Sequence, residues 1–125
     1  MQASILKQDK FLIVSVTGSM TDADFMDLRD ELASTVRRFR STGVIVDVTA
    51  LDVIDSFAAR TLRGIAQMVK MLGAECVVVG IQPEVAFSMV ELGLTLEQTT
   101  TALDLEDGLD VLRTRVGGEK TRHGY

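Results

Sequence analysis

Short apolar runs alternate with longer amphipathic stretches along most of the chain. The runs are rich in β-branched residues, as is typical of strands, and cover residues 5–6, 11–17, 44–48 and 75–80, with a last short strand expected within 95–101. The stretches between them carry apolar residues three and four positions apart, which predicts helices with one buried face. In the third of these stretches the repeat consists of Val85, Met89 and Leu92.

Residues typical of helix ends bound these amphipathic stretches. Thr21 and Asp24 form a capping pair ahead of the first helix, Pro83 occupies the first position of the third, and Asp104 precedes the fourth. Glycines that can adopt a positive φ are expected to end the first three helices: Gly43, Gly73 and Gly93.

The order of the predicted elements is β-β-α-β-α-β-α-β-α. Right-handed crossovers between successive strands would place the helices against the sheet. We therefore expect an α/β fold with a mixed, mostly parallel sheet and about four helices. The length of 125 residues fits one domain, expected over residues 3–117, followed by a flexible C-terminal tail at 118–125.

Composition and charge narrow the classes of function. Hydrophobic residues make up 46% of the chain, enough for a core that needs no disulfide or metal. The net charge of −5 argues against nucleic acid as a direct partner, because a negative protein gains no counterion-release energy there. With the single cysteine Cys76, no signal-peptide pattern and no membrane-length apolar run, we expect a soluble, cytoplasmic protein.

The residues needed for enzymatic chemistry are scarce. The single histidine, His123, lies in the polar tail, and no glycine-rich phosphate loop precedes a lysine. Ser56 has no visible general base beside it in the sequence, so a hydrolase triad is not supported. We expect neither enzymatic activity nor a cofactor.

Three carboxylates fall near the end of the strand at 44–48: Asp47, Asp52 and Asp55. Such a cluster could bind Mg²⁺. Magnesium-binding receiver domains, however, also draw acids from a second strand end and add a lysine, and no acidic pair follows the first strand here. We favour the interpretation that Asp47 ties the loop by hydrogen bonds and Asp55 supports the start of the next helix, with no metal site.

The pair Asp55-Ser56 stands immediately before the apolar stripe of the second helix. A serine at or next to the N-cap satisfies a free backbone amide and stabilises the helix by about 1 kcal/mol. A phosphate at the same position would be tolerated by the free amides and the positive end of the helix dipole, so the domain would stay folded. The surface would nevertheless gain a dianion, which would expel a partner packed on it.

The neighbouring residues suit a docking face for such a partner. Phe57 and Phe87 lie off the buried stripes, and the small pair Ala58-Ala59 would let another backbone approach closely. We therefore take Asp55, Phe57, Ala58 and Phe87 as candidate partner-binding residues. Phe57 could instead pack against its own loop, and the sequence leaves both arrangements open.

Several segments resemble the STAS family of anti-anti-sigma factors: residues 44–49, 55–57, 80–86 and 91–94. The likeness covers nearly the whole chain and implies the STAS fold. Within that family, residues 55–57, 80–83 and 101–106 look most similar to the small antagonist subunit of the stressosome. Ser56 matches the family's phosphorylated position and Asp55 the acid that precedes it.

The resemblance also implies partners. Subunits of this kind form homo- or hetero-oligomers through their STAS domains, assemble with larger RsbR-type STAS proteins and sequester an RsbT-like serine kinase. The kinase phosphorylates the serine that matches Ser56 and departs, and an RsbX-like phosphatase resets it. Whether the output is a sigma factor is left open by the resemblance.

Two other functions remain open at this point. One is a purely structural subunit in which Ser56 only caps a helix; the other is a ligand-sensing module, for which the sequence shows no cluster of polar groups. The sequence also leaves open whether a threonine at positions 99–101 is modified.

Overall fold

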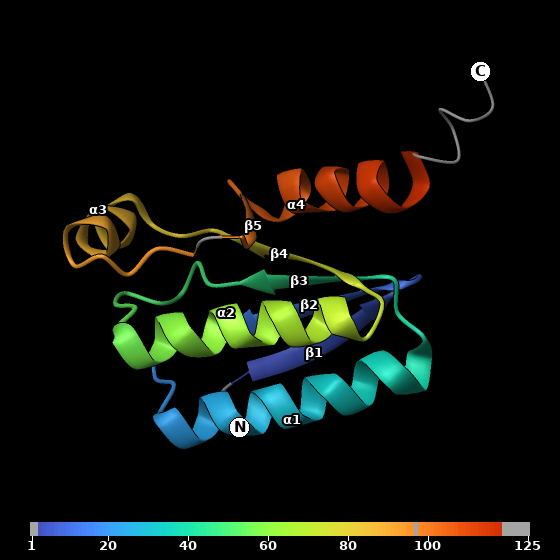
Figure 1. Cartoon of the computed structure of the whole chain (residues 1–125), viewed down its shortest axis with the longest axis horizontal. Coiled ribbons are helices and arrows are strands. Elements are labelled where there is room, and N and C mark those ends of the chain that lie inside the picture. Colours follow the sequence, from blue (N-terminus) through green and yellow to red (C-terminus); the bar gives the residue numbers. More distant parts are fainter. Residues whose placement is uncertain (1–2, 97, 119–125) are drawn as a thin grey trace.

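The computed structural model describes residues 3–96 and 98–118 of the chain, and the notation below follows Figure 1. Five strands form one sheet: β1 (Ala3–Gln8), β2 (Phe11–Val16), β3 (Gly43–Asp47), β4 (Glu75–Val79) and β5 (Thr100–Ala102). The helices are α1 (Asp22–Phe39), α2 (Ser56–Met71), α3 (Pro83–Glu91) and α4 (Leu105–Leu112), which a π-helical turn extends over Arg113–Gly118.

The strand order in the sheet is the order in the sequence, β1-β2-β3-β4-β5. β1 and β2 form an antiparallel hairpin, whereas β2, β3, β4 and β5 are parallel neighbours joined by helical crossovers. The prediction of a mixed, mostly parallel sheet with four helices is therefore confirmed. The C-terminal tail predicted at 118–125 lies, beyond Gly118, outside the described residues.

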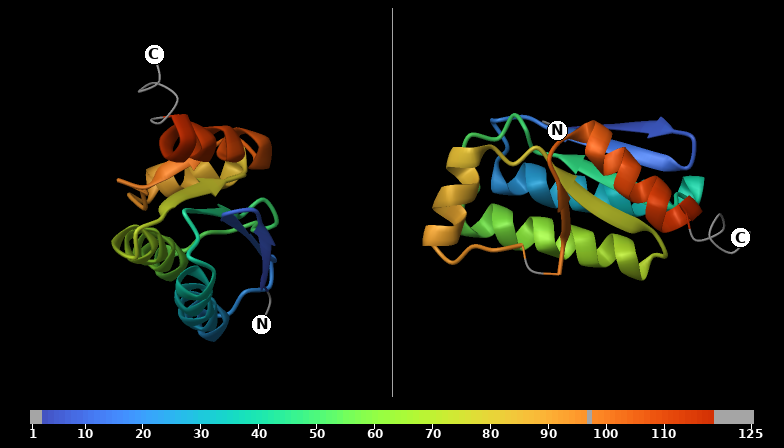
Figure 2. Two further views of the ribbon diagram at one scale, coloured as in Figure 1. Left: turned by 90° about the vertical axis from the view of Figure 1, so that its right-hand side faces the viewer. Right: turned by 90° about the horizontal axis from the view of Figure 1, so that it is seen from above.

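The sheet separates two apolar layers of unequal size. α1 and α2 cover one face and α4 the other, while α3 lies at the end of the sheet where the parallel strands finish (Figures 1 and 2). Alternate residues of β3 show the division, because Val44 and Val46 point into the larger core and Ile45 into the smaller one with Leu112. β3 and β4 are buried on both faces, as their continuous apolar runs predicted.

Two predicted helix details are corrected by the structure. α1 ends at Phe39, and Arg40 takes the left-handed conformation (φ 52°) that we assigned to Gly43, which instead begins β3. Leu92 is 70% exposed because it is the C-cap of α3 and points away from the core. Gly73 and Gly93 do adopt positive φ directly after the C-caps of α2 and α3, as predicted.

Candidate functional site

The candidate site lies at the carboxyl edge of the sheet, where β3 leads into α2. Asp47 is the last residue of β3, and its Oδ1 accepts two hydrogen bonds from Thr49, one from the backbone N–H at 2.9 Å and one from the hydroxyl at 2.6 Å. This arrangement closes the first turn of the loop. The predicted role of Asp47 as the residue that ties the loop is thus confirmed.

A second set of contacts joins this loop to the segment after β4. Gln82 Nε2 donates a hydrogen bond to the Thr49 carbonyl oxygen at 2.7 Å. Gly80 has φ 82°, and a methyl group on its Cα would overlap the Thr49 hydroxyl. Thr49 therefore connects two loops 33 positions apart, a role that sequence analysis missed because a threonine in a loop carries no local signal of its distant partners.

Asp55 is the N-cap of α2, and Ser56 is the first residue of the helix. Asp55 Oδ1 accepts a hydrogen bond from the Ala58 N–H at 2.8 Å, and its carbonyl accepts one from the Ala59 N–H. In the described part of the chain the backbone amides of Ser56 and Phe57 have no hydrogen-bond partner, and the Ser56 side chain is exposed. The capping role belongs to Asp55, which leaves the serine hydroxyl free for other chemistry.

The predicted docking residues divide into exposed and buried groups. Phe87 is 68% exposed on α3, whereas Phe57 is half-buried and packs against the larger core. Ala58 and Ala59 are 4% and 0% exposed, because both face the sheet from α2. The expectation that these alanines admit a partner's backbone is therefore corrected: they serve the core.

Apolar side chains near this edge remain uncovered. Val53 precedes α2 and is 73% exposed; Val90 on α3 is 71% exposed. Phe87 lies three positions before Val90 on α3, so the two are neighbours on the helix surface, and the exposed Leu92 follows at the C-cap. Exposed apolar residues that adjoin one another, instead of lying singly, favour an interaction site.

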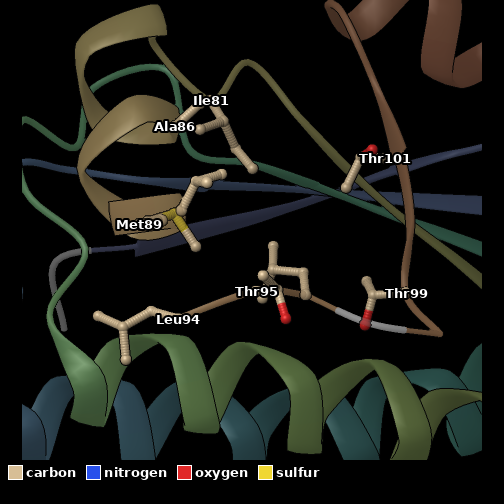
Figure 3. Close-up of a pocket in the computed structure, with 9 residues that line it drawn as sticks. Ile81, Ala86, Met89, Leu94, Thr95, Thr99 and Thr101 are labelled. Atoms are coloured by element: carbon tan, nitrogen blue, oxygen red, sulfur yellow. The ribbon is translucent and has the colours of Figure 1, made fainter. Parts of the chain in front are cut away.

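Beside α3 lies an open groove of about 310 Å³ (Figure 3). Its apolar walls include Ile81, Met89 and Leu94, and the hydroxyls of Thr99 and Thr101 lie along its other side. The segment that forms its floor is fixed from α2, because Arg63 Nη1 donates a hydrogen bond to the Thr95 carbonyl oxygen at 3.0 Å. The sequence did not predict this groove because its two walls come from α3 and from the irregular segment before β5.

The three carboxylates that could have formed a metal site do not gather. Within residues 3–96 and 98–118, no group of three or more histidine, cysteine or acidic side chains is placed to hold a metal ion. Instead, one carboxylate oxygen of Asp47 accepts a hydrogen bond from the Thr49 hydroxyl, and one of Asp55 accepts a hydrogen bond from the Ala58 amide. No helix in the described ranges is long and apolar enough to cross a membrane.

Comparison with known proteins places the chain and its fold in a family. The STAS domain model matches residues 2–108. The structure of an RsbS variant from Moorella thermoacetica with a serine-to-glutamate substitution is 32% identical and aligns over 94% of this chain and 99% of that one, with a TM-score of 0.80. A chain from the structure titled "Molecular architecture of the stressosome, a signal integration and transduction hub" is 35% identical over 90% of this chain and 97% of that one, with a TM-score of 0.77.

Among curated proteins, the chain is similar to the RsbT co-antagonist protein RsbRA of Bacillus subtilis (strain 168), with 28% identity over 81% of this chain. The match spans 37% of RsbRA, so the chain corresponds to about a third of that relative's length. The unphosphorylated anti-sigma factor antagonist SpoIIAA shares the fold at a TM-score of 0.69 and 14% identity, covering 89% of this chain and 96% of that one. With the family model matching most of its length, the chain belongs to the STAS domain family.

Proposed function

We propose that this protein is a stressosome-type antagonist subunit, which holds an RsbT-like serine kinase and releases it when Ser56 is phosphorylated. The observation that carries the proposal is the placement of Ser56. It is exposed and is the first residue of α2, and its hydroxyl does not cap the helix because Asp55 does. The protein acts as a binding module in the cytoplasm and not as an enzyme. RsbR-type STAS proteins are its partners in assembly, in keeping with its similarity to RsbRA.

A phosphate on Ser56 is compatible with the folded domain. The unpaired amides of Ser56 and Phe57 can donate to its oxygens, and the helix dipole favours negative charge at this end. Arg60 is exposed four positions further along α2, the spacing at which side chains on a helix are neighbours. The modification would thus change the surface without unfolding the domain.

The same phosphate opposes a docked kinase. Asp55 already places one carboxylate at the helix start, and a phosphate adds a charge of about −1.5 to −2. Arg60 can offset only part of this charge, and a partner packed over the start of α2 would have to desolvate the rest, which costs several kcal/mol. Release of the kinase follows, and removal of the phosphate by an RsbX-like phosphatase restores binding.

The test is phosphorylation by the RsbT-like kinase of the same genome with Mg-ATP, followed by intact-mass and peptide mass spectrometry. We expect one phosphate on Ser56, none in Ser56→Ala, and normal incorporation in the control Ser88→Ala, which removes another exposed helical serine. Kinase capture should be lost in Ser56→Asp while its unfolding free energy stays within about 0.5 kcal/mol of wild type. If a kinase that is active on another substrate transfers no phosphate to this protein, the result would favour a structural subunit without a phospho-switch.

The groove beside α3 favours a second candidate function, ligand sensing. Its volume of about 310 Å³ lies at the lower end of the range for small-molecule sites, and its walls are mainly apolar with hydroxyls on one side. A thermal shift with a metabolite and nucleotide panel tests this function. Stabilisation that is lost in Val90→Trp, which places a large side chain at the exposed wall of the groove, would support it.

A further inference from the structure

The turn between β1 and β2 and the last turn of α1 form one basic surface, at the end of the molecule opposite α3 (Figures 1 and 2). Thr42 joins the two elements, because its N–H and its hydroxyl donate to the Lys10 carbonyl oxygen at 2.8 and 3.4 Å. Lys7 Nζ and Arg38 Cζ lie 5.6 and 5.0 Å from the centre of the Phe39 ring. We call the cationic residues gathered here the basic end: Lys7, Lys10, Arg37, Arg38 and Arg40.

The charges of the basic end are available to a partner. Its five side chains are exposed, and within the described part of the chain none of them forms an ion pair. Asp9 is the acidic residue of the hairpin turn, and the nearby Glu75 lies 4.0 Å from Arg115. The helix dipole favours arginines in the last turn of α1, but it does not account for Lys7 and Lys10 on the hairpin. In a chain of net charge −5, this is a local concentration of positive charge.

Arg40 occupies a backbone conformation that suits other residues better. Its φ of 52° lies in the left-handed region, where a Cβ atom is disfavoured and where helices usually end on glycine or asparagine. Among the described residues the Arg40 side chain forms no hydrogen bond or ion pair. A residue held in a costly conformation without a stabilising contact of its own points to a role outside the domain.

The shape of the surface narrows the chemistry of the partner. Arg37 and Arg38 border an open hollow of about 550 Å³, and the adjoining Phe39 is 42% exposed. A flat membrane surface would leave such a hollow empty. Cations already contact the Phe39 ring, which leaves it poorly placed to stack on a nucleic-acid base. Carboxylates, in contrast, pair with arginine through two parallel hydrogen bonds, and an extended peptide can follow a hollow.

We propose that the basic end binds an extended acidic segment of another protein. Its carboxylates pair with Arg37, Arg38 and Arg40, and an apolar side chain of the segment packs against Phe39. The occupant is a peptide segment and not a further copy of this domain. The inference goes beyond the proposed function and does not depend on it, since Ser56 lies at the start of α2, at the other end of the molecule (Figure 1).

Fluorescence anisotropy of the full chain with a labelled peptide tests the proposal. The probe is a peptide of about a dozen glutamates and aspartates with one central leucine. We expect Arg38→Gln to weaken binding about threefold, and Arg37→Gln with Arg38→Gln at least about tenfold. The matched control is Arg29→Gln, which removes the same charge from the acidic half of α1, where Arg29 pairs with Asp30, and should bind within about twofold of wild type. Binding should also weaken in roughly 0.5 M salt.

Arg40→Gly separates binding from folding. Glycine adopts a φ of 52° without strain, so the urea midpoint of this variant should rise while its peptide affinity falls about threefold. Misfolding cannot produce both changes. The proposal is overturned if wild type does not bind the peptide, or if Arg40→Gly or the Arg37 and Arg38 double variant binds it as wild type does. Equal or tighter binding to phosphatidylserine vesicles, or to an oligothymidylate of the same charge, would also overturn it and assign the surface to a membrane or to nucleic acid.

Discussion

Gly64 and Gly108 lie inside helices α2 and α4, and the same substitution should shift stability in opposite directions at the two positions. An alanine methyl at Gly108 would meet Val79 Cγ1 at 2.6 Å and Ile45 Cδ1 at 3.4 Å. Both neighbours are fully buried. At Gly64, which is exposed, nothing lies within 4 Å of the added methyl.

The magnitudes follow from two opposing effects. Alanine improves helix propensity over glycine by about 0.8–1 kcal/mol, and this is the whole effect at Gly64. At Gly108 the added methyl forces α4 away from the sheet, and overpacking of this kind costs about 1–3 kcal/mol. Val79 cannot yield cheaply, because its branched side chain is held on a strand buried on both faces. The overpacking cost at Gly108 therefore lies in the upper half of that range, about 2–3 kcal/mol, and after the helix gain of about 1 kcal/mol Gly108→Ala should lose about 1–2 kcal/mol. Gly64→Ala should gain up to about 1 kcal/mol.

Urea unfolding followed by circular dichroism measures both variants against wild type. With a slope of about 2 kcal/mol per M, the midpoint should fall by roughly 0.5–1 M for Gly108→Ala and rise by up to about 0.5 M for Gly64→Ala. Equal slopes would show that only stability has changed. A rise in the midpoint of Gly108→Ala would refute the close packing of α4 on the sheet.

Three further predictions concern other buried or capping groups. Asp55→Ala leaves the Ala58 amide without its acceptor and should cost about 1 kcal/mol in urea unfolding, with Asp55→Asn close to wild type. An alanine at Gly80 would have to adopt a φ of 82° and would overlap the Thr49 hydroxyl. Gly80→Ala should therefore lower the free energy of unfolding by at least about 2 kcal/mol, and a change near zero would contradict the loop geometry. Burial, with a smaller contribution from Glu75, raises the pKa of the Cys76 thiol from 9.0 to about 12. As the pH rises, the unfolded chain therefore loses the thiol proton before the folded protein does. The free energy of unfolding should fall by about 1.4 kcal/mol per pH unit between pH 9.0 and about pH 12. This fall should be absent in a Cys76→Ala variant.

Local signals in the sequence were sufficient for most elements of the fold. Periodicity and capping residues predicted the helices, and continuous β-branched runs predicted the two central strands. Gly43 was misread because glycine suits both a helix end and a close contact, and here it packs against Leu112 and Phe11 while Arg40 takes the left-handed turn. A non-glycine residue with positive φ gives no signal in the sequence.

The site was only partly predictable, for a related reason. The pattern of the strand located Asp47 at its end, and the pattern of the helix start located Asp55 and Ser56. The hydrogen bond from Gln82 to Thr49 and that from Arg63 to Thr95 join residues 33 and 32 positions apart. Such pairs depend on how the crossovers fold back over the sheet, which a pattern within one segment does not encode. The burial of Ala58 agrees with its helical spacing to Leu62 and Ile65, which are buried on the same face of α2.

The strand order has a consequence for how the chain acquires its structure during synthesis. Each strand pairs with the one made just before it, so the hairpin and the α1 and α2 layer can assemble as the chain emerges. α4 is made last, and until it docks, Ile45, Val77 and Val79 lie on an open apolar face. A chain that stops after β5 would therefore expose this apolar face and be prone to aggregate, and the docking of the eight residues of α4 completes its burial.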